Sequence, residues 1–131
     1  MKKSIWVFLT IAVLLGIGYY YITAKKEDLI RVTSPMQNEV IESPLTVTGE
    51  ARGYWYFEAS FPVELVDSNG TQLALKPAMA KGEWMTEEFV PFEVTLEFGK
   101  PTTNTGILIL HKDNPSGLVE NDDELRIPVK F

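Results

Sequence analysis

The sequence predicts an all-β fold: an immunoglobulin-like antiparallel β-sandwich of about seven to nine strands, preceded by one N-terminal transmembrane helix. Two observations predict the sandwich. After the first two dozen residues, apolar and polar side chains alternate in short runs that show no helical period. Turn residues interrupt these runs roughly every dozen positions, which is the usual spacing in such domains. A third observation, one long apolar run near the start, predicts the helix.

The apolar run extends from Ile5 to Ile22 and contains no charged residue. As a helix it would be about 27 Å long, close to the thickness of the hydrocarbon core of a bilayer. Tyrosines 19–21 lie at its far end, where aromatic rings favour the membrane–water interface. The alternative is a signal peptide cleaved near Gly16-Ile17-Gly18, which would leave a tyrosine-rich new terminus. We expect an uncleaved anchor, with the domain on the extracytoplasmic side of the membrane.

The charge of the chain is unevenly distributed. All 18 acidic residues lie at position 27 or later, whereas four of the 12 basic residues lie before it, so the remainder carries a net charge of −10. An acidic surface repels nucleic acid phosphates and anionic lipid headgroups. We therefore expect no nucleic-acid partner, and contact with the membrane only through Ile5–Ile22. Because the chain has no cysteine, it has neither disulfides nor a lipidation site of the lipobox type.

We expect a single domain at residues 29–131, after a membrane anchor or signal peptide at 1–24 and a charged linker at 25–28. A first strand, Leu29–Thr33, leads into the stretch from Ser43 to Val66, around which the rest is organised. Side chains alternate between the two faces of a strand, so Tyr54 and Tyr56 are expected to face away from the core. The residues expected to face inward are Leu45, Val47, Trp55, Phe57, Ala59, Phe61, Val63 and Leu65.

Further strands complete the expected sandwich. Asn69-Gly70 predicts a hairpin turn, because both residues accept positive φ, and a strand containing Leu73 and Leu75 follows it. Pro128 predicts that the last strand lies at an edge or lacks one donor, since proline has no N–H group. The remaining strands are expected at Phe92–Phe98, Ile107–Leu110 and Leu125–Phe131.

The sequence contains no recognisable catalytic or metal-binding pattern. The single histidine, His111, has no cysteine to pair with, and the chain has neither a nucleophile elbow nor a phosphate-binding loop. The acidic groups Glu87-Glu88 and Asp122–Glu124 lack the spacing of a calcium site. We therefore predict that the protein is not an enzyme and uses no cofactor or metal.

Three groups of motif residues occur along the domain. The first runs from Ile30 to Phe57-Glu58 and includes Ser34-Pro35, Ser43-Pro44-Leu45, Gly49, Ala51-Arg52-Gly53 and Trp55. The second is Gly82-Glu83-Trp84-Met85-Thr86 followed by Val90-Pro91-Phe92-Glu93, and the third is Ile127-Pro128-Val129-x-Phe131. In combination they resemble the Gmad2 domain, the immunoglobulin-like domain first described in bacterial spore germination proteins. The resemblance covers Ile30 to Phe131. It implies a β-sandwich of the bacterial cell envelope without assigned catalytic residues.

The candidate site surrounds the aromatic cluster at positions 54–57. Arg52 and Glu58 flank this cluster, and we expect them to form a structural ion pair that holds the turn. Alternatively, Arg52 belongs to a recognition patch, since Arg, Tyr and Trp concentrate binding energy at interfaces. The residues of that patch would be Arg52, Tyr54, Tyr56 and Trp84.

These observations predict a non-catalytic, membrane-anchored domain of the bacterial envelope that contacts another envelope protein or the cell wall. The resemblance implies a link to spore germination. The alternative is a binding module for peptidoglycan or another carbohydrate that uses the exposed aromatic side chains.

Overall fold

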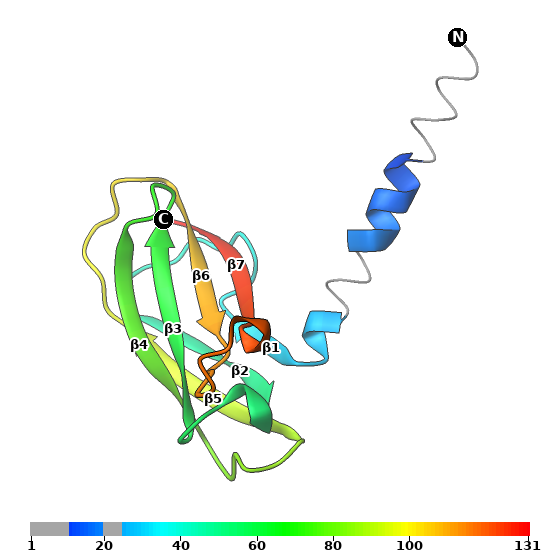
Figure 1. Cartoon of the computed structure of the whole chain (residues 1–131). Coiled ribbons are helices and arrows are strands. Elements are labelled where there is room, and N and C mark those ends of the chain that lie inside the picture. The colour runs from blue at the N-terminus through cyan, green and yellow to red at the C-terminus, as the bar shows by residue number, and fades with distance from the viewer. Residues whose placement is uncertain (1–10, 20–24) are drawn as a thin grey trace.

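A computed structural model describes residues 11–19 and 25–131 (Figure 1). Residues 11–19 are helical, and residues 25–27 form a short helical turn before the first strand. Within these described ranges, no helix has both the length and the apolar character needed to cross a bilayer. The predicted span Ile5–Ile22 lies partly outside the described residues, so the membrane anchor remains a prediction.

The domain consists of seven strands and two short 3-10 helices. Their bounds are β1 (Ile30–Ser34), β2 (Leu45–Arg52), η1 (Gly53–Trp55), β3 (Ser60–Asp67), β4 (Gln72–Ala80), β5 (Phe89–Leu96), β6 (Thr105–His111), η2 (Val119–Asn121) and β7 (Glu124–Lys130). All strands pair antiparallel in the order β1-β2-β5-β4-β3-β6-β7. The predicted all-β class and the lower end of the predicted strand number are confirmed.

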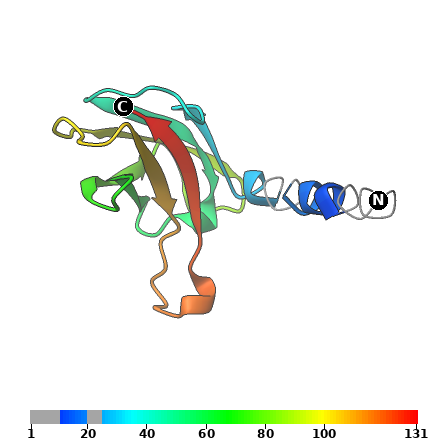
Figure 2. The same ribbon diagram turned by 90° about the horizontal axis from the view of Figure 1, so that it is seen from above.

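The sheet curls so that its two halves face each other (Figures 1 and 2). Strands β1, β2 and β5 form one half, and β4, β3, β6 and β7 form the other. The halves are joined by only two residue pairs between β4 and β5, Met79 with Glu93 and Ala80 with Phe92. The predicted sandwich is therefore one nearly closed sheet, in which β4 connects the two layers.

The two outer strands of the curled sheet, β1 and β7, do not pair with each other. The segment between β1 and β2 narrows the gap between them. The Asn38 N–H donates to the Pro128 carbonyl at 2.7 Å, and the Ile41 N–H donates to the Lys130 carbonyl at 2.8 Å. In return, the Lys130 N–H donates to the Glu39 carbonyl at 2.9 Å. These bonds cover the outer edge of the C-terminal half of β7. The opening that remains between β1 and β7 is a groove of about 770 Å³.

The core lies between the two halves and follows the predicted alternation along most strands. Phe61, Val63 and Leu65 on β3 are fully buried, and every second residue of β5 from Val90 to Leu96 is also buried. The rings of Phe61 and Phe92 meet edge to face across the two halves, with centroids 4.9 Å apart. This contact places an aromatic pair at the centre of the core, where such geometry is favourable.

The predicted strand between Arg52 and Ser60 does not form. Instead, η1 follows β2 directly, and the chain then reverses at Glu58 and Ala59, whose φ angles are 50° and 65°. A 3-10 turn and a reversal with positive φ both interrupt the two-residue alternation of a strand. As a result Phe57 is 40% exposed, and its predicted place in the core is wrong.

Candidate functional site

Two loops meet at the lower end of the domain in Figure 1. These loops contain most of the predicted site residues. We call residues 53–59, between β2 and β3, and residues 81–88, between β4 and β5, the loop pair. The Gly53 N–H donates to the Glu88 carbonyl at 3.1 Å. A Cβ at Gly53 would lie 1.8 Å from the Thr86 carbonyl oxygen and 2.3 Å from that of Trp84. Only glycine permits this approach, so Gly53 fixes one loop against the other.

Four large side chains on the loop pair are exposed or half-buried, and we call these residues together the loop patch: Tyr54, Phe57, Trp84 and Met85. Tyr54 is 48% exposed and Met85 is 73% exposed. Trp84 is half-buried, and its ring meets the ring of Phe57 edge to face with centroids 6.4 Å apart. The structure thus places two of the predicted recognition residues, Tyr54 and Trp84, on this surface. The sequence placed Phe57 in the core and so missed it as a member of this surface.

Arg52 lies at the base of the loop pair rather than on the loop patch. Its Nη2 is 3.0 Å from Asp28 Oδ1, and its Nε donates to the Asp28 carbonyl at 3.0 Å. Its Nη1 donates to the Glu87 carbonyl at 3.4 Å. The guanidinium carbon also lies 4.0 Å from the centroid of the Phe89 ring. These contacts connect the start of the domain, the end of β2 and the second loop.

The ion pair expected between Arg52 and Glu58 is therefore replaced by one between Arg52 and Asp28. The reason is the backbone between the two residues. Arg52 ends β2 beside the chain segment that enters β1, whereas Glu58 lies in the exposed reversal that follows η1. A continuous strand would have kept Arg52 and Glu58 on one extended ribbon, whereas the 3-10 turn between them ends that ribbon.

Tyr56 is a buried residue of the core and not the surface residue that the alternation predicted. It is 3% exposed, and its hydroxyl donates to the Val90 carbonyl at 2.6 Å. Its ring packs edge to face on Phe61 with centroids 5.1 Å apart. Burial raises the pKa of the Tyr56 hydroxyl well above its ordinary value of 10.0, because the charged phenolate would lose its hydration. Tyr56 therefore anchors the first loop from below.

The loop pair is acidic. Glu58, Glu83, Glu87 and Glu88 are all exposed, and none of them forms an ion pair with another residue of the described part of the chain. Glu83 also accepts the Met85 N–H through Oε1 at 3.0 Å, which shapes the second loop.

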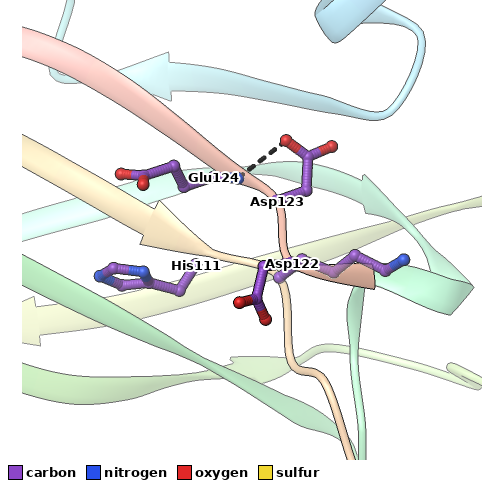
Figure 3. A pocket seen from close by; sticks show the side chains of 5 residues that line it. His111, Asp122, Asp123 and Glu124 are labelled. Carbon is purple, nitrogen blue, oxygen red and sulfur yellow. Dashed lines mark hydrogen bonds between the residues drawn. The ribbon is translucent and has the colours of Figure 1, made fainter. Parts of the chain in front are cut away.

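A separate hollow of about 390 Å³ lies where β6 ends and β7 begins. His111 and the acidic residues 122–124 line it, but Figure 3 shows the His111 ring and the Asp123 carboxylate pointing to different sides. His111 Nε2 lies 3.3 Å from Glu64 Oε1, and Asp123 pairs with Lys26. Among the described residues, no group of three His, Cys, Asp or Glu side chains is placed to hold a metal ion.

Comparison with known families shows a match over most of the domain. The family model described as "Gmad2: Immunoglobulin-like domain of bacterial spore germination" matches residues 29–117. The match begins just before β1, includes the whole loop pair and ends before β7. The resemblance inferred from the motifs is confirmed over these residues. Neither the curated proteins nor the solved structures yield a match.

Proposed function

This chain belongs to the Gmad2 family, the immunoglobulin-like domain of bacterial spore germination, and on that premise we propose that it is a non-catalytic domain of the cell envelope that binds a partner protein through the loop patch. The observation that carries the proposal is the exposure of Tyr54, Phe57 and Met85 beside Trp84 on two adjoining loops. Exposed apolar surface with a polar rim is typical of protein-binding sites. Aromatic side chains and methionine are enriched in such interfaces.

The loop pair is well suited to binding because its backbone is held in place. Gly53 and Arg52 both form hydrogen bonds to the second loop, and Tyr56 is buried beneath the first. A surface that is already ordered loses little conformational entropy when a partner binds. Arg52 and Tyr56 therefore support the loop patch, and the contact residues are those that remain exposed.

We further propose that residues 5–22 hold the domain on the extracytoplasmic side of a membrane. The apolar run and its tyrosine-rich end support this arrangement. In this position the loop patch would contact other proteins of the envelope.

The second candidate is binding of peptidoglycan or another carbohydrate. The exposed rings of Tyr54 and Phe57 favour it, because aromatic rings present flat apolar faces on which sugar rings stack. Neither of the two described hollows lies at the loop patch, since one is where β6 ends and β7 begins and the other is between β1 and β7. A sugar at the loop patch would therefore bind on its surface and not in either hollow.

A photo-crosslinking amino acid placed at Met85 in the full chain, in living cells, tests the two candidates. We expect a discrete protein adduct from position 85 and none from the exposed position Thr102, in the loop between β5 and β6. Co-sedimentation of the full chain with purified sacculi is measured beside it. Binding to sacculi that Tyr54→Ala abolishes, without a protein adduct at Met85, would replace the first candidate by the second. Failure of both assays would reject the loop patch as a binding site.

A further inference from the structure

The carboxylates of the loop pair belong to residues that adjoin the loop patch in the sequence. Glu58 follows Phe57 directly, and Glu83 precedes Trp84 directly. Glu87 and Glu88 end the same loop, beside the backbone of Gly53. Each of these side chains is exposed, so all four carboxylates are accessible to a partner.

The two basic residues closest in the sequence to these carboxylates form ion pairs with other acidic residues. Lys81 forms its ion pair with Glu93 on β5, and Arg52 pairs with Asp28. None of the four carboxylates forms an ion pair within the described part of the chain. A partner with positive side chains would supply the missing charge, whereas an acidic partner would be repelled.

The domain itself shows how an aromatic ring and a neighbouring carboxylate together bind a guanidinium group. Arg31 and Arg52 each lie 4.0 Å from the centroid of the Phe89 ring. Each of them also reaches a carboxylate, Glu50 at 3.2 Å and Asp28 at 3.0 Å. An aromatic face with a neighbouring carboxylate is thus a working arginine site in this fold, consistent with the stacking and fork geometry of the guanidinium group.

The loop patch carries the same two elements, and no described lysine or arginine side chain stacks on its rings. Tyr54, Phe57 and Trp84 supply ring faces, and the four glutamates supply carboxylates. We propose that the loop patch binds a segment of its partner protein that carries arginine or lysine side chains separated by apolar residues. The inference rests on the proposed function, since it specifies the chemistry of the partner at that surface.

A synthetic peptide of alternating arginine and leucine, labelled with a fluorophore, is the direct probe. Its binding to the full chain is measured by fluorescence anisotropy, next to a peptide in which neutral citrulline replaces arginine. We expect the citrulline peptide to bind about tenfold more weakly, which corresponds to about 1.4 kcal/mol. Equal binding of the two peptides would overturn the proposal.

A matched pair of variants separates the loop patch from the general acidity of the domain. Glu83→Gln with Glu87→Gln removes two charges from the loop pair and leaves an oxygen that accepts the Met85 N–H. Glu39→Gln with Glu42→Gln removes two exposed charges from the segment between β1 and β2. We expect the first variant to weaken binding of the arginine peptide about tenfold and the second to leave it within about twofold. An equal loss in both variants would show unspecific attraction and would refute the site.

The native partner provides the decisive readout. Mass spectrometry of the adduct at Met85 identifies the partner segment, which we expect to contain arginine or lysine next to the crosslink. If adducts persist but the segment has no basic residue, the charge chemistry is wrong while the proposed function stands. If position 85 gives no protein adduct at all, both the partner chemistry and the proposed function fail.

Discussion

Replacing Arg52 by alanine should destabilise the domain mainly through lost stacking and backbone contacts, and only slightly through the lost ion pair. The side chain of Arg52 is 24% exposed, whereas that of its partner Asp28 is 71% exposed. Ion pairs with such an exposed partner contribute between zero and about 1 kcal/mol. The other contacts of Arg52 are its stack on the half-buried Phe89 ring and two hydrogen bonds to backbone carbonyls.

The expected magnitude follows from these contacts. The stack contributes about 0.5–1 kcal/mol, and the two hydrogen bonds about 0.5–1.5 kcal/mol each, with the longer bond at the low end. Arg52→Ala should therefore cost about 2 kcal/mol. Asp28→Ala and Glu58→Ala should each cost under about 0.5 kcal/mol. Arg52→Lys should not restore stability, because an ammonium group cannot stack and bind both carbonyls as the guanidinium group does.

Urea unfolding of the full chain, followed by circular dichroism, measures these differences. A loss of 2 kcal/mol lowers the midpoint by about 1–2 M for a domain of this size. A loss in Asp28→Ala as large as that in Arg52→Ala would refute the stacking argument and make the ion pair the main contribution. A comparable loss in Glu58→Ala would instead support the ion pair between Arg52 and Glu58 that the sequence suggested.

Three further outcomes are expected. Phe92→Ala should lower the free energy of unfolding by about 3–5 kcal/mol in the same urea assay, because Phe92 is buried. Phe57→Ala should lower it by under about 1 kcal/mol, because Phe57 is partly exposed. Equal losses in the two variants would contradict this difference in burial. Tyr56→Phe should cost about 1 kcal/mol at neutral pH through the lost bond to a carbonyl. Burial raises the pKa of the Tyr56 hydroxyl above 10.0, so its contribution to stability is complete below about pH 10 and is lost as the pH rises further. In alkaline urea melts the wild type should therefore lose more stability than Tyr56→Phe. Gly53→Ala should cost at least about 2 kcal/mol and abolish the crosslink from the second loop, whereas Gly82→Ala, which has no atom within 4 Å of the added Cβ, should do neither.

The parts of the fold that depend on local alternation could be predicted from the sequence. Strands β3 and β5 bury every second side chain, and the hairpin turn at Gly70 has the expected positive φ of 80°. The break after Arg52 could not be predicted in this way. It depends on the contact of Gly53 with the backbone of residues 84–86, which are distant in the sequence.

The candidate site was predictable in composition but not in geometry. Tyr54 is exposed, as the alternation predicted, and Trp84 is half-buried. The positions of Tyr56 and Phe57 exchanged, because the 3-10 turn shifts the phase of the alternation. The partner of Arg52 was missed because Asp28 belongs to the segment that had been assigned to the linker.

The strand pairing of residues 38–41 with β7 has a consequence for self-association. A bare outer strand offers its free N–H and C=O groups to any other chain, which leads to edge-to-edge aggregation. Here the bonds to the Pro128 and Lys130 carbonyls occupy the C-terminal half of the outer edge of β7, and Pro128 has no N–H group to offer. The other outer strand, β1, has five residues and an irregularity between Val32 and Ser34, which makes it a poor template. Many copies of this domain can therefore lie at high local density without pairing edge to edge into fibres.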